Sequence, residues 1–463
     1  MYCECANNVC FFPSLDNLAR QSFKRLPTTM EWARFRKYAR RMRELNQLVT
    51  LDSEVFSVMQ LSTINEPLLP NLKSLRLCRI EETFIPFIPL FLSPRTIYIT
   101  LRFFEPDLPN TAVASMITAF PTVCPNLQVI SLLDLPSDPM ITTAVSGMLL
   151  ATNQNTLQWL YVDSPLTEQA IEMLFKLPNL RGLDVLIEET SPSTSLPNLT
   201  ELITRYNNAS NWPRLFHGAI LGKLESITFI PRSEQIGDLL GAFKRAALPL
   251  CLQNTLSKFH LYTPYSWNPD YSSLLPFMQL VDLDITSSCD GGCSSRVDDN
   301  TVINLSRAMP KLETLVLGSK PCSQFTTGVT AKGLVALARN CPDLFFLRIH
   351  FQVASLSIPP TSPRMAPDVE STASRVDCGL MYLDVGEIPV PEESVLIVAL
   401  TLSRIFPHIS EIFYSTDDDK GWEKVESAIN DSQRIVDYSS KQHPSHYALK
   451  CPIDPSTGAT PGS

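Results

Sequence analysis

One spacing of apolar residues returns along most of the chain. Its clearest copy is 310–317, Pro-Lys-Leu-Glu-Thr-Leu-Val-Leu, in which a turn residue precedes leucines at offsets 0, 3 and 5. Side chains of an extended strand alternate between faces, so the last two leucines share one face. Twelve copies begin at Leu72, Leu127, Leu157, Leu180, Leu199, Leu224, Leu256, Leu280, Leu312, Leu344, Leu380 and Ile409, and a degraded copy lies near 97–101. Each copy predicts a β-strand.

Several gaps between the copies carry the apolar spacing of a helix. Counting the degraded copy, successive copies begin 19 to 36 residues apart. Thr330 can cap a helix whose apolar face contains Leu334, Leu337 and Ala338. One strand and one helix cannot bury their own apolar face, so neighbouring units must stack. The sequence therefore predicts an α/β solenoid, with parallel strands on the concave face and helices on the convex face.

The predicted solenoid takes up most of the chain as one body rather than as two or three compact domains. It spans 51–430, and a Pro/Ser/Thr-rich insertion at 356–375 is expected to be disordered within it. A basic capping helix is expected at 29–50. Residues 1–28 carry no repeat and are expected to be weakly ordered or disordered, and 431–463 should be a mostly disordered tail.

The capping helix combines an apolar stripe with a basic face. Trp32, Phe35, Ala39 and Met42 share one side of a helix expected at 31–45. The other side is basic, and it contains Arg34, Arg36, Lys37, Arg40, Arg41 and Arg43. This face is interpreted as a solvated cap over the first strand, with a nuclear-import or acidic-partner patch as the alternative.

Composition excludes several classes of protein. Hydrophobic residues make up 44% of the chain and charged residues 18%, which is typical of a globular protein with an ample core. The formal net charge of −9 argues against general binding to nucleic acid or to an anionic membrane. No apolar run is long enough for a membrane span, and the longest candidate, 395–402, is predicted to be a buried helix.

The start of the chain lacks the basic and apolar regions of a secretion signal, so an intracellular location, cytoplasmic or nuclear, is expected. In that setting the twelve cysteines are interpreted as small apolar residues rather than as disulfide partners.

The common catalytic signatures are absent from the sequence. It has no Gly-rich phosphate loop, no Gly-x-Ser-x-Gly elbow and no His-Glu-x-x-His pair. We therefore expect no enzymatic activity, no cofactor and no metal. Cys289 and Cys293, the cysteines of residues 3–10, and the acidic run 417–419 leave a metal reading open, but none has a full ligand set.

The positions between the buried ones in each strand should face the concave side. Taking offsets 2, 4 and 6 from the leading residue gives a candidate protein-binding set of Trp159, Tyr161, Asp184, Lys258, His260, Tyr262, Asp282, Asp284, Phe346, Arg348, His350 and Tyr382. Aromatic residues and arginine dominate protein interfaces. The alternative is that the large aromatics only cover neighbouring strands.

Two features of the chain resemble a known family. The strands, with helices such as that of 330–344, resemble the cysteine-containing leucine-rich repeats of F-box proteins. The segment 31–45, Glu-Trp-Ala-Arg-Phe-Arg-Lys-Tyr-Ala-Arg-Arg-Met-Arg-Glu-Leu, and the closing 421–426, Gly-Trp-Glu-Lys-Val-Glu, resemble the F-box-like repeat proteins of mushroom-forming fungi.

The resemblance implies a ribonuclease-inhibitor-like fold and a substrate receptor of an SCF-type ubiquitin ligase, which holds a protein target on its repeats. No Leu-Pro-x-Glu-Ile-Leu-type F-box opening occurs in the sequence, so the SCF adaptor and the cullin are expected as partners only if an F-box lies upstream. The alternatives are a ribonuclease-inhibitor-like binding scaffold with no ubiquitin-ligase role and, less well supported, an enzyme hidden in the interrupted repeats.

Overall fold

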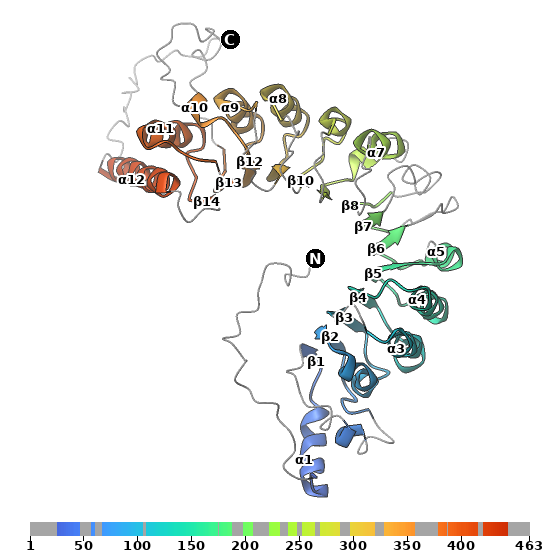
Figure 1. Ribbon diagram of the computed structural model, residues 1–463. Helices are drawn as coiled ribbons and strands as arrows, with labels where there is room; N and C mark the ends of the chain where they lie inside the picture. Colours follow the sequence, from blue (N-terminus) through green and yellow to red (C-terminus); the bar gives the residue numbers. More distant parts are fainter. Residues whose placement is uncertain are drawn as a thin grey trace, which may run out of the picture.

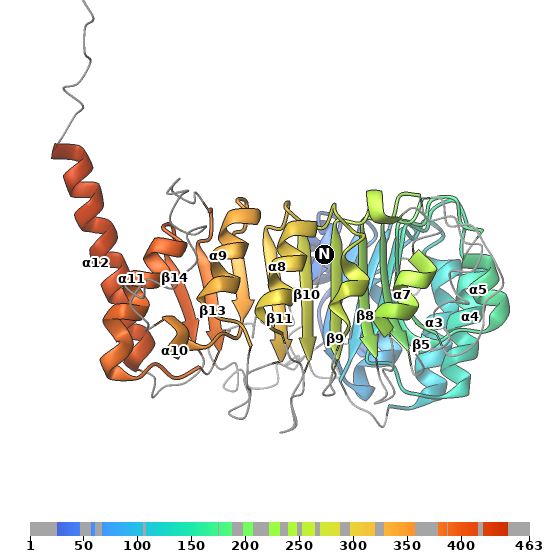
Figure 2. The ribbon, with the colours of Figure 1, turned by 90° about the horizontal axis from the view of Figure 1, so that it is seen from above.

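The computed structural model describes residues 26–46, 57–60, 67–104, 108–174, 176–187, 198–206, 222–231, 239–247, 252–263, 269–287, 297–319, 328–356, 378–386, 388–414 and 420–442. Within these ranges the chain forms one sheet of fourteen parallel strands in sequence order. The strands line the inside of an arc and the helices cover its outside (Figure 1), so the arrangement is solenoid-like. Figure 2 shows the strands side by side behind the helices.

The strands are β1 (Glu44–Asn46), β2 (Ser74–Ile80), β3 (Tyr98–Phe103), β4 (Val129–Leu133), β5 (Trp159–Pro165), β6 (Gly182–Ile187), β7 (Glu201–Tyr206), β8 (Ser226–Pro231), β9 (Lys258–Thr263), β10 (Asp282–Ser287), β11 (Thr314–Ser319), β12 (Phe346–Ile349), β13 (Tyr382–Gly386) and β14 (Glu411–Tyr414).

The α-helices are α1 (Thr29–Ala39), α3 (Asn110–Val123), α4 (Pro139–Ala151), α5 (Glu168–Leu174), α7 (Leu239–Ala247), α8 (Asp299–Ala308), α9 (Ala331–Asn340), α10 (Val353–Leu356), α11 (Val395–Ile405) and α12 (Lys420–Gln442). The 3-10 helices are η3 (Glu82–Phe91), η6 (Leu252–Asn254), η7 (Tyr271–Leu274) and η8 (Glu392–Ser394).

The repeated spacing marks the strands as predicted. In each of the twelve clear copies the strand begins two residues after the leading residue. Leu312, Leu315 and Leu317 are all buried, since these offsets face the helices. Leu315 of β11 pairs with Leu347 of β12 in parallel, which confirms the predicted parallel pairing.

The degraded copy has a polar residue in the leading place. β3 pairs with β4 from Tyr98 opposite Val129, so the register puts Thr96 where other copies have leucine. Thr96 is buried, and its hydroxyl donates to the carbonyl of Leu72 at 3.2 Å. That hydrogen bond satisfies the buried hydroxyl and joins this repeat to the one before it.

The Pro-Asn turn before the leading leucine links successive repeats. The side-chain amide of Asn179 donates to the carbonyl of Asn155 at 2.7 Å, and that of Asn198 donates to the carbonyl of Pro178 at 2.5 Å. Both bonds join side chains and carbonyls of adjacent repeats at the exposed edge of the sheet. The asparagine therefore aligns each strand with the one before it.

The capping helix is shorter than predicted, and the sheet begins earlier. α1 ends at Ala39 rather than near Leu45, and β1 pairs in parallel with β2, so the sheet begins before residue 51. The carbonyl of Arg43 accepts the backbone N–H groups of Lys73 and Ser74. A helix through this point would leave that edge of β2 without hydrogen-bond partners.

Two predictions about the C-terminal helices need correction. α12 has 23 residues and runs to Gln442, so the tail expected from residue 431 is helical over its first part. Helix α11 is amphipathic rather than buried throughout, because Leu396 and Leu400 are at least half exposed while Leu402 is buried. Within α12, Trp422 is fully buried and begins the apolar face that packs on α11.

Several predictions concern residues outside the described ranges. These are the N-terminal residues 1–25, the pair Cys289 and Cys293, the acidic run 417–419, nearly all of the insertion at 356–375, and the last residues, 443–463.

The described cysteines form no disulfides with one another. Cys124, Cys341 and Cys378 are buried, as expected of small apolar residues, and Cys78 is half-buried. Burial raises the pKa of the Cys124 thiol to about 11 and that of Cys341 to about 12. Among the described helices, none is both long and apolar enough to cross a membrane.

Candidate functional site

The pairing register aligns the concave side chains in rows across the sheet. Trp159 of β5 lies opposite Gly182 of β6, and the same row continues through Lys258 and Asp282 to Phe346 and Tyr382. The predicted residues lie in three clusters, on β5 and β6, on β9 and β10, and around β12 and β13. The structure therefore places them on one face without gathering them at one point.

Burial differs among these residues. Trp159, Tyr161, Tyr262, Asp282, Asp284, Phe346, Arg348 and Tyr382 are half-buried, Lys258 is exposed, and Asp184, His260 and His350 are buried. His350 was predicted to lie in a strand, but β12 ends at Ile349. Its ring lies beside the backbone of Gly318, which has a left-handed φ of 127°.

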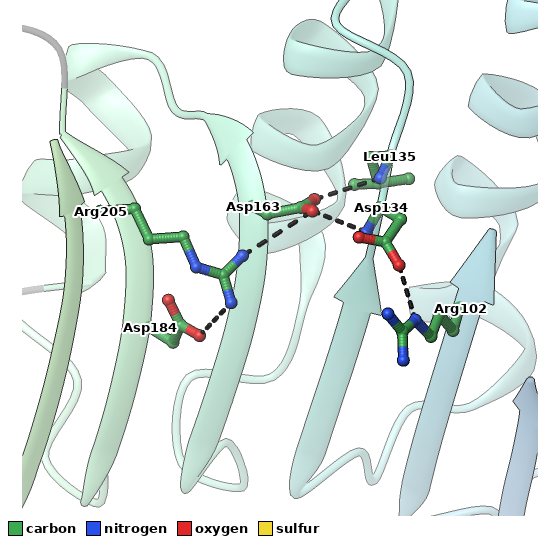
Figure 3. Close-up of polar contacts among 6 residues, drawn as sticks. All are labelled: Arg102, Asp134, Leu135, Asp163, Asp184 and Arg205. Carbon is green, nitrogen blue, oxygen red and sulfur yellow. Dashed lines mark hydrogen bonds and ion pairs between the residues drawn. The ribbon is translucent and has the colours of Figure 1, made fainter. Parts of the chain in front are cut away.

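The first cluster belongs to a polar network on strands β5 to β7 (Figure 3). Arg205 Nη2 lies 2.8 Å from Asp184 Oδ2, and its Nη1 lies 3.7 Å from Asp163 Oδ2. Asp163 also accepts the backbone N–H groups of Asp134 at 2.6 Å and of Leu135 at 3.2 Å. Arg205 thus holds two largely buried carboxylates on neighbouring strands.

The network reaches toward the N-terminal repeats through the turn after β4. Asp134 has a left-handed φ of 56°, unusual for a residue other than glycine, and its backbone N–H is held by Asp163. Its own carboxylate accepts from Arg102 Nε at 2.6 Å, although both side chains are about half exposed. Exposed pairs of this kind contribute little stability, so this link sets geometry more than energy.

Sequence reasoning missed Arg102, Asp163 and Arg205, although a signal for them existed. All three occupy offset 6 of their repeats, the position that it used for Tyr262. Asp163 and Arg205 looked like isolated charges because the contact between their side chains, across the intervening β6, is not visible in the sequence.

Trp159 covers its neighbouring strand. Its ring lies directly over Gly182, where an added Cβ would fall 1.8 Å from Trp159 Cε3, and it stacks on Tyr161 with ring centroids 6.2 Å apart. Trp159 therefore packs on its neighbouring strand, and it remains half-buried on the concave face. Burial, and then the charge of Glu201, raises the pKa of Tyr161 far above its ordinary value.

The second cluster joins charges on β9 and β10. His260 Nε2 lies 3.0 Å from Asp282 Oδ2, and Asp284 accepts from the Tyr262 hydroxyl at 2.9 Å and the Thr286 hydroxyl at 2.6 Å. Burial raises the pKa of Asp284, while the two hydroxyl hydrogen bonds oppose that shift. The cluster is a preformed polar surface on two neighbouring strands.

The third cluster is aromatic. Tyr382 packs edge-on against Phe345 with ring centroids 4.8 Å apart and stacks against Phe413 at 6.0 Å. Arg348 Nε donates to Asp384 at 2.6 Å beside these rings. Phe345 and Phe413 are exposed by 45% and 40%, and neither was in the predicted set, although Phe413 occupies offset 4 of its repeat.

The arrangement suits contact more than chemistry. Several charges on the described concave strands are paired with one another, as Arg205 is with Asp163 and Asp184. Among the described residues no group of three or more His, Cys, Asp or Glu side chains could hold a metal ion. What the face offers is half-buried aromatic rings beside fixed charges, the residue types that contribute most at protein interfaces.

The fold and this face define a solenoid-like α/β protein with an aromatic and polar concave surface. In comparisons with known proteins, no family model matches the sequence and no curated protein matches it.

Proposed function

We propose that this chain is a non-catalytic recognition module that holds a protein on its concave face. The observation that carries the proposal is the row of aromatic and charged side chains that the parallel register aligns along one curved sheet. Solenoids present extended concave surfaces of this kind to their partners. Because many of these side chains are already held by neighbours, binding a partner would cost little side-chain conformational entropy.

The finer proposal rests on the family resemblance. The repeats are leucine-rich repeats of the ribonuclease-inhibitor type, and the module acts as the substrate receptor of an SCF-type ubiquitin ligase. The buried leucines at offsets 0, 3 and 5 and the buried Cys341 before the turn support this proposal. Recovery of an SCF adaptor and a cullin with the tagged protein from its native cell would support the ligase role, and their absence would favour a scaffold.

The concave face is tested by a double substitution, Trp159→Ala with Tyr262→Ala. The tagged variant should lose the main protein that the wild type captures, because truncated aromatic hot spots each cost about 2 kcal/mol or more of binding. The matched control is Met140→Ala with Leu150→Ala, two exposed residues of α4 on the convex side. Capture should survive in the control.

Circular dichroism and thermal melting must show that both double variants are folded. If the folded concave variant still captures the partner as the wild type does, the binding surface lies elsewhere and the proposal fails. Loss of capture by both variants would also count against it, since a general defect would then explain the result.

A further inference from the structure

A hollow of about 400 Å³ lies at the edge of the sheet where strands β6, β7 and β8 begin. Its wall includes the side chain of Trp159 and turn residues of the next three repeats, namely Asn179, Arg181, Asn198, Thr200 and Lys223. Its volume falls within the range of ligand pockets. The hollow is continuous with the concave face, because Trp159 belongs to both.

The local sequence explains why space exists here. Position 182 is glycine, so the concave row has no side chain between Trp159 and Glu201. The indole lies over that glycine and forms an apolar wall. The rest of the wall comes from the turns: the residues on either side of Leu180 and of Leu199, and Lys223 before Leu224.

The charged residues that line the hollow in the described part of the chain are both basic. Arg181 and Lys223 line it, and among the described residues no acidic one does. Lys223 Nζ donates to Asn198 Oδ1 at 2.8 Å, and Asn198 in turn donates to the carbonyl of Pro178, so the lysine is fixed above the hollow. Arg181 is exposed, and in the described part of the chain its guanidinium has neither an ion pair nor a hydrogen bond.

The contrast with the rest of the molecule is informative. The whole chain carries a formal net charge of −9, yet the described wall of the hollow has two cations and no acid. The nearest acid along the chain, Glu201, interacts with Tyr161 on the concave face and does not line the hollow. A paired cation site in an acidic protein favours an anionic group.

We propose that this hollow binds an oxyanion, a carboxylate or a phosphate, carried by the protein held on the concave face. Arg181 and Lys223 bind the charged oxygens, and the adjoining apolar part of the ligand packs on Trp159. The Thr200 hydroxyl donates to the carbonyl of Arg181 at 3.1 Å and so holds the backbone of that wall. Charge-assisted hydrogen bonds from arginine to such oxygens are among the stronger polar contacts. This proposal rests on the proposed function, because it names the chemistry of the partner.

The test needs no knowledge of the partner. Three acetylated and amidated tetrapeptides, Ala-Ala-X-Ala with X as phosphoserine, glutamate or serine, are titrated into the full chain labelled with ¹⁵N at its tryptophan indoles. The Trp159 signal is identified by its loss in Trp159→Phe. Both charged peptides should shift it in a saturable way, and the serine peptide should not.

A charge-removing pair, Arg181→Gln with Lys223→Gln, should weaken the binding of the charged peptides at least tenfold. Lys311→Gln is the matched control, because Lys311 holds the same turn position in another repeat and donates to Gln279 Oε1 at 2.7 Å. Its variant should bind like the wild type.

The two charged peptides also separate the possible sources of the oxyanion. Binding of the phosphoserine peptide alone would assign the hollow to a phosphorylated partner, and equal binding of the glutamate peptide would assign it to an acidic one. Either outcome supports the proposal. No saturable shift with either peptide, an equal shift with the serine peptide, or an equal loss in Lys311→Gln would overturn it.

Failure here is distinguishable from failure of the proposed function. The peptide titration can fail while the Trp159 and Tyr262 double substitution still abolishes capture, and then only the oxyanion site is lost. Conversely, peptides that bind in the hollow while capture survives the double substitution would leave an oxyanion site without a concave-face partner.

Discussion

At the scale of single residues, the shape of the inner face depends on where one side chain makes room for another. Gly182 is buried beneath the indole of Trp159, which could not lie there above any larger residue. The same contact forms the apolar wall of the hollow and shields the start of β6. One glycine therefore decides how a large aromatic ring is presented.

Gly182→Ala should displace the Trp159 ring, because the new Cβ would fall 1.8 Å from Cε3. We expect a changed Trp159 indole signal and a loss of about 1–3 kcal/mol of stability from overpacking. Gly147→Ala is the control, since nothing lies within 4 Å of that Cβ in α4, and alanine should stabilise the helix by about 0.5–1 kcal/mol. An unshifted indole signal in Gly182→Ala would contradict the contact.

Two aspartates should respond to pH in opposite directions. Burial raises the pKa of Asp284, so the native state binds its proton more tightly and the stability from this group falls as pH rises from about 4. The hydroxyl of Thr301 lowers the pKa of Asp298, the N-cap of α8. The stability that the Asp298 carboxylate contributes is therefore present above about pH 4 and is lost as the pH falls through the native pKa.

The measurement is urea unfolding of Asp284→Asn and Asp298→Asn between about pH 3 and pH 7, each compared with the wild type. The stability of Asp284→Asn relative to the wild type should rise with pH, and that of Asp298→Asn should fall. Slopes of the same sign for both variants would refute the assigned environments.

At the scale of elements, the helices are tied to one another as well as to the sheet. Asp299 in the first turn of α8 accepts the backbone N–H groups of Thr330 and Gly333 at 2.8 and 3.0 Å, and also the Thr330 hydroxyl at 2.7 Å. Thr330 is the N-cap of α9, so one carboxylate fixes where the next helix begins. Gly333 leaves the space that Asp299 Oδ1 needs.

Asp299→Ala should therefore lower the stability of the fold by about 2–3 kcal/mol, since hydrogen bonds to charged groups contribute about 1.5–3 kcal/mol each and water replaces part of the loss. Asp343→Ala, an exposed aspartate in the turn after α9, should stay within about 0.5 kcal/mol of the wild type. Chemical unfolding measures both, and equal losses would mean that the link contributes nothing.

At the scale of the whole molecule, each repeat packs chiefly on its neighbours, so each repeat is stabilised mainly by the repeats on either side of it. α12 covers the last strand and helix of the described sheet. Trp422 is fully buried there, its Nε1 donates to the carbonyl of Ile388 at 2.5 Å, and its ring packs edge-on against Phe351. This helix closes the apolar end of the stack.

Trp422→Ala should cost about 3–5 kcal/mol at that end, because it removes a buried indole. In a linear array the loss should be local, so amide exchange should speed up in β13, β14 and α11 while β4 to β6 keep their protection. Leu396→Ala on the exposed face of α11 is the control and should leave exchange unchanged. Uniform loss of protection along the chain would show a single cooperative unit instead.

The sequence by itself determined the strands of the described sheet other than β1, their order and their buried faces. Leu312, Leu315 and Leu317 specify which side of β11 meets the helices, and period-two alternation then fixes which side is concave. Thr330 was readable as a helix cap for the same reason, since capping depends on residues close in the chain. The concave set followed from the same counting, and eleven of its twelve members lie in the described strands.

Only the tertiary structure decided which of those side chains meet. Asp163, Asp184 and Arg205 come from three strands, and their pairing depends on register and side-chain direction across the sheet. The end of α1 at Ala39 depends on the hydrogen-bonding edge of β2, which lies about thirty residues further along the chain. Local sequence patterns determine the strand and helix of each repeat. Contacts between repeats depend on distances in the folded structure, which cannot be read from the spacing of residues along the chain.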